Sequence, residues 1–109
     1  DGKVVIGRLG DDLDVAAGSD AAVLCALMVV AQVKAALGDL SRVARIVKLG
    51  VFVNSAPGFG DQPEVANGAS DLMVALFGDA GKHARAAVGV AALPRNAAVE
   101  IDAIIEVAR

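Results

Sequence analysis

Residues 83–107 read HARAAVGVAALPRNAAVEIDAIIEV, and this stretch decides the fold. Its apolar and β-branched residues predict two strands, over 85–93 and 98–107, joined by the turn Pro-Arg-Asn. We expect these two strands to pair as a hairpin. Arg85 and Glu100 interrupt the apolar pattern, and charged side chains are rarely buried without a partner. Each of the two is therefore a candidate functional residue or one half of a structural ion pair.

The predicted hairpin does not bring Arg85 to Glu100. If the turn centres near Arg95 and Asn96, both side chains point to the same face but stand roughly 20 Å apart along the sheet. Glu106 is then the expected cross-strand partner of Arg85. Arg85 is therefore either a charge at the sheet edge or a residue that receives a carboxylate from outside the hairpin.

The chain before this stretch predicts alternating strands and helices. Asp14 is the expected N-cap of a long helix and Gly38 its C-terminal stop. The predicted elements are a strand over Lys3 to Leu9, a helix over 14–38, a strand over 45–55 and a helix over 61–78. This order favours one α+β domain over residues 1–109, with an antiparallel-rich sheet covered on one face by two helices.

Composition narrows the class of protein. The chain has 109 residues, of which 56% are hydrophobic and 3% aromatic, and its formal net charge is −3. An acidic chain with few aromatic side chains lacks the basic face and stacking platforms that nucleic acids need. The apolar run 21–31 is too short to span a bilayer, and no signal peptide opens the chain. We expect a cytoplasmic protein that buries some apolar surface between subunits.

Three further residues are candidates for a functional site. His83 is the single histidine of the chain and is predicted to be an ordinary loop residue, since one histidine does not build a metal site. Cys25, the single cysteine, is predicted to be a small buried apolar residue and agrees with a reducing compartment. Ser70 lies at the edge of the apolar stripe of the second helix, where its side chain can face a cleft. The glycines match no phosphate-binding or dinucleotide-binding motif, so no cofactor and no metal are predicted.

The stretch HARAAVGVAALPRNAAVEIDAI resembles the C-terminal signature of the RidA (YjgF) family of reactive-intermediate deaminases. That signature has an Arg entering a strand, then Leu-Pro, then Val-Glu-Ile before the last strand. The segments LGDLSRVARIVKLGVFV and VFVNSAPGFGDQPEVANGASDLMVALFG also fit the family. The resemblance implies a chorismate-mutase-like homotrimer, in which the sheets form an inner barrel, the helices lie outside and a ligand cleft lies at each subunit interface.

The resemblance also implies roles for particular residues. Arg85 matches the arginine that holds a substrate carboxylate, and Glu100 matches the glutamate that positions or activates water. Ala87 stands where many active members carry Cys. Ser70 stands where members often carry Asn, and Asn67 lies one turn away, so these positions are also expected to line the substrate site. The family's first strand has no counterpart before residue 1, and the domain is therefore expected to lack its N-terminal strand.

Three functions follow from this comparison. The first is a 2-iminobutanoate/2-iminopropanoate deaminase-like hydrolase, which converts small imino acids derived from enamines such as 2-aminoacrylate to 2-keto acid and ammonia. The second is a trimeric module that binds small carboxylates through Arg85 without turnover. The third, an endoribonuclease or translation inhibitor, is disfavoured by the acidic pI and the single histidine. The first needs no metal or organic cofactor, and neither a membrane nor a nucleic acid is an expected partner.

Overall fold

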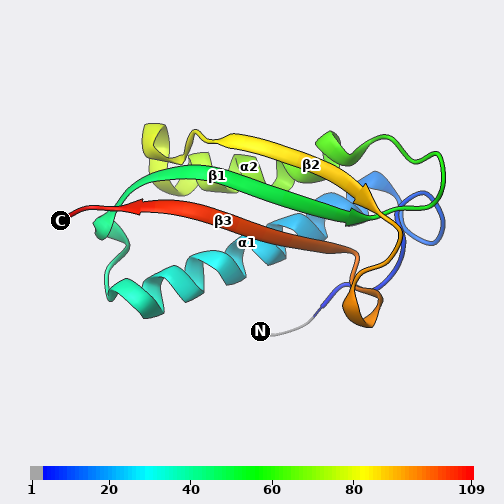
Figure 1. Cartoon of the computed structure of the whole chain (residues 1–109), viewed down its shortest axis with the longest axis horizontal. Helices are drawn as coiled ribbons and strands as arrows, with labels where there is room; N and C mark the ends of the chain where they lie inside the picture. Colours follow the sequence, from blue (N-terminus) through cyan, green and yellow to red (C-terminus); the bar gives the residue numbers. More distant parts are fainter. Residues whose placement is uncertain (1–3) are drawn as a thin grey trace.

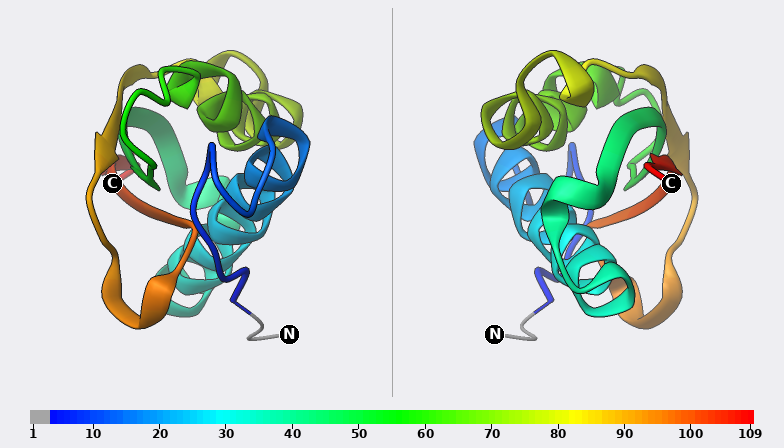
Figure 2. Two further views of the ribbon diagram at one scale, coloured as in Figure 1. Left: turned by 90° about the vertical axis from the view of Figure 1, so that its right-hand side faces the viewer. Right: turned by 90° about the vertical axis from the view of Figure 1, so that its left-hand side faces the viewer.

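The computed structural model describes residues 4–109 and arranges them as a sheet with two helices on one face (Figure 1). In chain order the elements are α1 (Val15–Leu37), β1 (Val43–Asn54), α2 (Gln62–Phe77), β2 (Ala84–Val90) and β3 (Val99–Val107). The two views along the sheet place both helices on the same side of it (Figure 2). The predicted α+β class and the placement of the helices are therefore confirmed.

The three strands lie in the order β2-β1-β3, with β1 parallel to β2 and antiparallel to β3. The predicted hairpin is wrong, because β1 lies between the two C-terminal strands, and the sheet is mixed rather than antiparallel-rich. The physical reason is burial: the β1 residues Ile46, Leu49, Val51 and Val53 are at most 1% exposed, so this strand takes the centre. Helix α2 connects β1 to β2, and such a crossover returns the chain in the parallel direction.

The predicted strand over residues 3–9 is also wrong where the structure describes it. Residue 3 lies outside the described part, and residues 4–9 make only isolated bridges, which join Ile6 to Ala97 and Leu9 to Ser55 and Leu13. Leu9 is nevertheless fully buried, and its backbone N–H donates to the Asn54 carbonyl over 2.8 Å. This segment therefore packs against the end of β1 without extending the sheet.

Both predicted caps of the first helix are confirmed. The Asp14 side chain accepts a hydrogen bond from the Ala17 N–H, and Gly38 at the C-cap has a φ of 83°, a value that favours glycine. The buried face of α1 is built from small residues: Gly18, Ala21, Ala22 and Ala26. Small side chains allow α1 to lie close to both α2 and the sheet.

The outer face of α1 is apolar as well. Leu24, Leu27 and Met28 are 39%, 44% and 43% exposed. By length and composition alone, α1 is apolar enough to cross a membrane, with a mean hydropathy of 1.8 over an 18-residue window. In this fold the helix packs through its alanine face against α2 and β3.

The close contact between the helices generates a stability prediction. A Cβ added at Gly68 of α2 would collide with the backbone carbonyl oxygen of Ser19 in α1. Overpacking costs about 1–3 kcal/mol, and a backbone atom moves aside less easily than a side chain, whereas the helix-propensity gain of alanine is only about 1 kcal/mol. We expect Gly68→Ala to lower the free energy of unfolding, measured by urea denaturation, by roughly 1–2 kcal/mol. Gly60→Ala is the control, since a Cβ there meets no atom within 4 Å. Equal stability of the two variants would contradict the close contact between Gly68 of α2 and Ser19 of α1.

Candidate functional site

Four polar side chains meet between α2 and the start of β2. The Arg85 Nη1 donates to Asn67 Oδ1 over 2.8 Å and to Ser70 Oγ over 3.3 Å. The His83 Nε2 lies 2.9 Å from the same Ser70 Oγ. Ser70 and His83 are partly buried, whereas Asn67 and Arg85 are exposed. We call these four residues the α2–β2 cluster.

The local geometry of two elements produces this cluster. Asn67 and Ser70 are three residues apart on α2 and therefore lie on the same helix face. His83 and Arg85 are two residues apart in extended chain and therefore point to the same side of the sheet. Arg85 pairs with Leu49 of β1, whose side chain is fully buried beneath the helices. The Arg85 side chain is thereby directed toward α2.

The hydrogen bonds of His83 define its tautomer when the ring is neutral. Its Nδ1 lies 2.6 Å from the carbonyl oxygen of Gly81. A carbonyl can only accept, so Nδ1 carries the proton and donates it. The neutral ring then has a lone pair on Nε2, which accepts the hydroxyl proton of Ser70. His83 lies outside the helices and strands, as predicted, but its hydrogen bonds to Ser70 and Gly81 were not predicted from the sequence. The available signal was its position two residues before Arg85.

The guanidinium of Arg85 keeps most of its donors for a ligand. Both of its hydrogen bonds use Nη1, and among residues 4–109 no partner is recorded for Nη2 or Nε. Nor does an acidic side chain in this part of the chain lie within ion-pair distance of Arg85, since the recorded pairs are Arg45–Glu106 and Lys82–Asp79. A planar fork of N–H groups without an internal carboxylate suits an external one.

Ala87 follows Arg85 on the same side of β2. It is partly buried and packs against the core, as expected for a position opposite the buried Val51. Its methyl group offers no hydrogen bond, so Ala87 can shape the floor of a site but cannot take part in proton transfer.

Glu100 lies apart from the α2–β2 cluster. It pairs with Phe52 of β1, three residues beyond the Leu49 that pairs with Arg85, so the two side chains point to opposite faces of the sheet. They are also on opposite outer strands, about 10 Å apart across the sheet and about 10 Å along it. The prediction that they share a face is wrong because it assumed a hairpin. The predicted Arg85–Glu106 pair is wrong too, because Glu106 lies 3.6 Å from Arg45.

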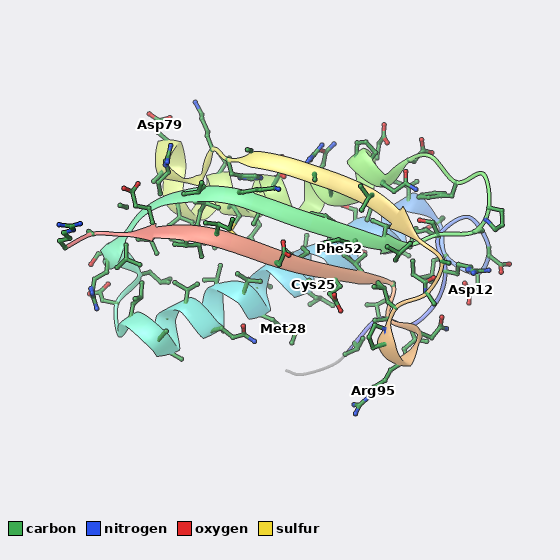
Figure 3. All side chains as sticks on the ribbon, in the orientation of Figure 1. Asp12, Cys25, Met28, Phe52, Asp79 and Arg95 are labelled. Carbon is green, nitrogen blue, oxygen red and sulfur yellow. The ribbon has the colours of Figure 1, made fainter. Side chains whose placement is uncertain are left out.

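Glu100 instead borders an apolar pocket of ≈ 280 Å³ between α1 and β3. Cys25 and Met28 of α1 line the same pocket (Figure 3). The Cys25 thiol donates to the Val99 carbonyl over 3.3 Å. Burial raises the pKa of the Cys25 thiol, and the negative charge of Glu100 raises it further. This thiol is therefore a poor nucleophile at neutral pH.

Residues 1–107 match the protein family described as "YjgF/chorismate_mutase-like, putative endoribonuclease". The chain belongs to this family. The α+β arrangement of two helices on a mixed three-stranded sheet is that of the chorismate-mutase-like YjgF fold.

Similar proteins come from three different organisms. Protein TCP17 of Trypanosoma cruzi is 59% identical over 106 residues, which cover 96% of this chain and 66% of that protein. The crystal structure of Atu1372 from Agrobacterium tumefaciens, a protein of unknown function, is 57% identical in sequence and has a TM-score of 0.93. The match covers 94% of this chain and 66% of the Atu1372 chain. A structure from Shewanella oneidensis, described as "a putative endoribonuclease", is 34% identical with a TM-score of 0.93, over 97% and 71% of the two chains. The chain thus spans just under two thirds of the length of the first two YjgF relatives.

The position of Glu100 near Cys25 can be tested by alkylation, since the YjgF chain has one cysteine. Removal of the Glu100 charge removes one cause of the raised thiol pKa and therefore increases the thiolate fraction at a given pH. We expect Glu100→Gln to accelerate the reaction of Cys25 with iodoacetamide at pH 8, followed by mass spectrometry, by up to about tenfold. Asp102→Asn, two residues along the same strand, is the control and should leave the rate unchanged. An unaltered rate in Glu100→Gln would show that the carboxylate does not reach the thiol.

Proposed function

We propose that the protein is an imine deaminase that hydrolyses small 2-imino acids of the 2-aminoacrylate type to 2-keto acid and ammonia. The observation that carries this proposal is the state of Arg85. Its guanidinium is held by two neutral side chains, Asn67 and Ser70, and has no acidic partner among the described residues. Membership in the YjgF family supports the resemblance from which this assignment comes, although the matching family description names a "putative endoribonuclease".

The substrate carboxylate binds to the donors of Arg85 that the cluster does not use. A bidentate pair between a guanidinium and a carboxylate fixes both the charge and the plane of the ligand. The imine carbon attached to that carboxylate is then held above Ser70 and His83, because Ser70 accepts from the same guanidinium. The barrier to imine hydrolysis is modest, so orientation of substrate and water supplies a large part of what the reaction needs. Neither a metal nor an organic cofactor is required.

Glu100 joins this site from a neighbouring subunit. Within one chain Glu100 and Arg85 are on opposite faces and opposite edges of the sheet, so a site that contains both needs two chains. The sheet face without helices exposes apolar side chains, including Val88 at 45% and Ile104 at 60%. Association of three such faces into an inner barrel would cover them and place the Glu100 edge of one subunit beside the Arg85 edge of the next. The carboxylate then accepts a hydrogen bond from the attacking water and orients it.

A second candidate function is a binding module for small carboxylates without turnover. Ala87, at a position where a polar side chain would touch the substrate, favours this alternative because it supplies no proton donor or acceptor. Both candidates use Arg85 in the same way, so they differ only in the fate of the bound molecule.

The first test couples a dehydratase that generates 2-aminoacrylate to this protein and measures keto-acid formation above the uncatalysed rate. Loss of charge-assisted hydrogen bonds to the carboxylate should lower kcat/KM in Arg85→Ala by roughly 10²-fold. Arg85→Lys retains the positive charge but not the planar fork of N–H groups, so its kcat/KM should lie between those of the wild type and Arg85→Ala. Arg45→Ala is the control, because its pair with Glu106 is exposed and contributes little. Full activity in Arg85→Ala would refute the assignment, and pyruvate binding without turnover would establish the binding module.

The second test asks whether Arg85 and Glu100 act from different subunits. Arg85→Ala and Glu100→Gln chains, each inactive alone, are denatured together, refolded and assayed. If each site takes one residue from each of two neighbours, random mixing restores about a quarter of the sites. If both residues act within one chain, no mixed assembly contains an intact site, and activity stays at the level of the separate variants.

A further inference from the structure

The proposed reaction needs a group that accepts and returns protons beside Arg85. Water must lose a proton as it attacks the imine carbon, and the nitrogen must gain one before ammonia leaves. Arg85 stays protonated, the Asn67 amide does not ionise and the Ala87 methyl has no proton to exchange. Ser70 and His83 are the remaining members of the cluster, and their hydrogen bond is 2.9 Å long. Glu100 of the neighbouring subunit orients the attacking water in the proposed site, and the Ser70–His83 pair takes the proton that this water loses.

We propose that Ser70 and His83 form a proton relay that serves the substrate bound at Arg85, an inference that rests on the proposed deaminase function. Ser70 is the member that contacts the substrate and water. His83 acts through Ser70, and the Gly81 carbonyl holds its ring by accepting from Nδ1 over 2.6 Å. The relay is therefore anchored at its far end by a backbone group.

The relay has two hydrogen-bonded states that use the same atoms. With a neutral imidazole, the Ser70 hydroxyl donates to Nε2, and its oxygen accepts from Arg85 over 3.3 Å. With a protonated imidazole, Nε2 donates to Ser70 Oγ, and the hydroxyl proton is then turned toward the substrate. Ser70 thus takes a proton in the first state and gives one in the second, and neither heavy atom has to move.

The chemical step follows from these two states. The substrate enters as the protonated imine, and the water oxygen forms a bond to its carbon while the C=N π electrons move to nitrogen. The proton lost by water passes to Ser70 as the Ser70 proton passes to His83 Nε2. The imidazolium then returns a proton through Ser70 to the amine nitrogen. The C–N bond breaks as the hydroxyl oxygen forms the C=O bond, and ammonia leaves with the hydroxyl proton as ammonium.

The kcat of the His83→Gln variant distinguishes a proton relay from a contact that only holds the structure. Glutamine can keep the hydrogen bonds to Ser70 and Gly81, but it cannot store a proton. We expect kcat to fall on the order of 10²-fold with little change in KM, because Arg85 still holds the carboxylate. Ser70→Ala should lose about as much, and the double variant should lose no more than either single one. Lys82→Gln is the control, since Lys82 precedes His83 and its ammonium group pairs with Asp79 outside the cluster.

A spectroscopic measurement tests the relay without turnover. His83 is the single histidine, so ¹⁵N NMR of the labelled protein reports one imidazole. We expect the Nδ1–H tautomer in the neutral ring, and a displaced Nε2 resonance in Ser70→Ala but not in Lys82→Gln. The opposite tautomer would overturn the relay, whatever turnover is measured. So would an Nε2 resonance with the same chemical shift in Ser70→Ala and the wild-type protein.

The two proposals fail in different ways. If wild-type turnover depends on Arg85 but His83→Gln keeps its kcat, the relay is overturned and the deaminase function stands. If the wild-type protein has no turnover although the Ser70–His83 coupling is present by NMR, the deaminase function fails, and the relay falls with it as part of that reaction. Loss of kcat together with the expected tautomer supports both.

Discussion

The parallel pairing of β2 with β1 is the constraint on which the rest of the structure depends. A parallel pair needs a crossover connection, and α2 is that connection. The helix must lie against the strands that it joins, so its inner edge faces the first residues of β2. Asn67 and Ser70 meet His83 and Arg85 for this reason, although 15 residues separate Ser70 from Arg85 in the chain. The candidate site is a direct product of the topology.

The same topology separates Arg85 from Glu100, the two charged residues that interrupt the apolar pattern of the C-terminal stretch. With β1 in the centre, Arg85 and Glu100 lie on the two outer strands. Their register partners, Leu49 and Phe52, are an odd number of residues apart, so the side chains point to opposite faces. No side-chain rotation can close that gap. A functional link between Arg85 and Glu100 therefore requires association of subunits, whereas the Ser70–His83 pair is complete within one chain.

Sequence patterns predicted the elements better than their arrangement. Helix caps depend on neighbouring residues, and Asp14 and Gly38 were identified correctly because each acts within one turn. Strand order depends on which strand is buried most deeply, and this is a competition among segments far apart in the chain. The short turn at 94–96 resembles a hairpin connection, yet Arg95 and Asn96 both have a φ of 57° and carry the chain past β1. The contact between His83 and Ser70 was not predicted for a similar reason, since Ser70 is on another element.

The charge balance of the cluster explains why it suits an anion. A guanidinium that pairs with a carboxylate of its own chain, as Arg45 does with Glu106, has its charge partly balanced. Arg85 is held by an amide oxygen and a hydroxyl oxygen, which fix its orientation without cancelling its charge. The positive charge is therefore available to an anion, and the Ser70–His83 pair adjoins it through the hydrogen bond from Arg85 to Ser70. Because Ser70 bonds to both Arg85 and His83, a carboxylate bound to the guanidinium would place its adjacent carbon beside the proposed relay. In the proposed reaction, anion binding and proton transfer would thus both depend on the Ser70 hydroxyl, and its loss should affect both.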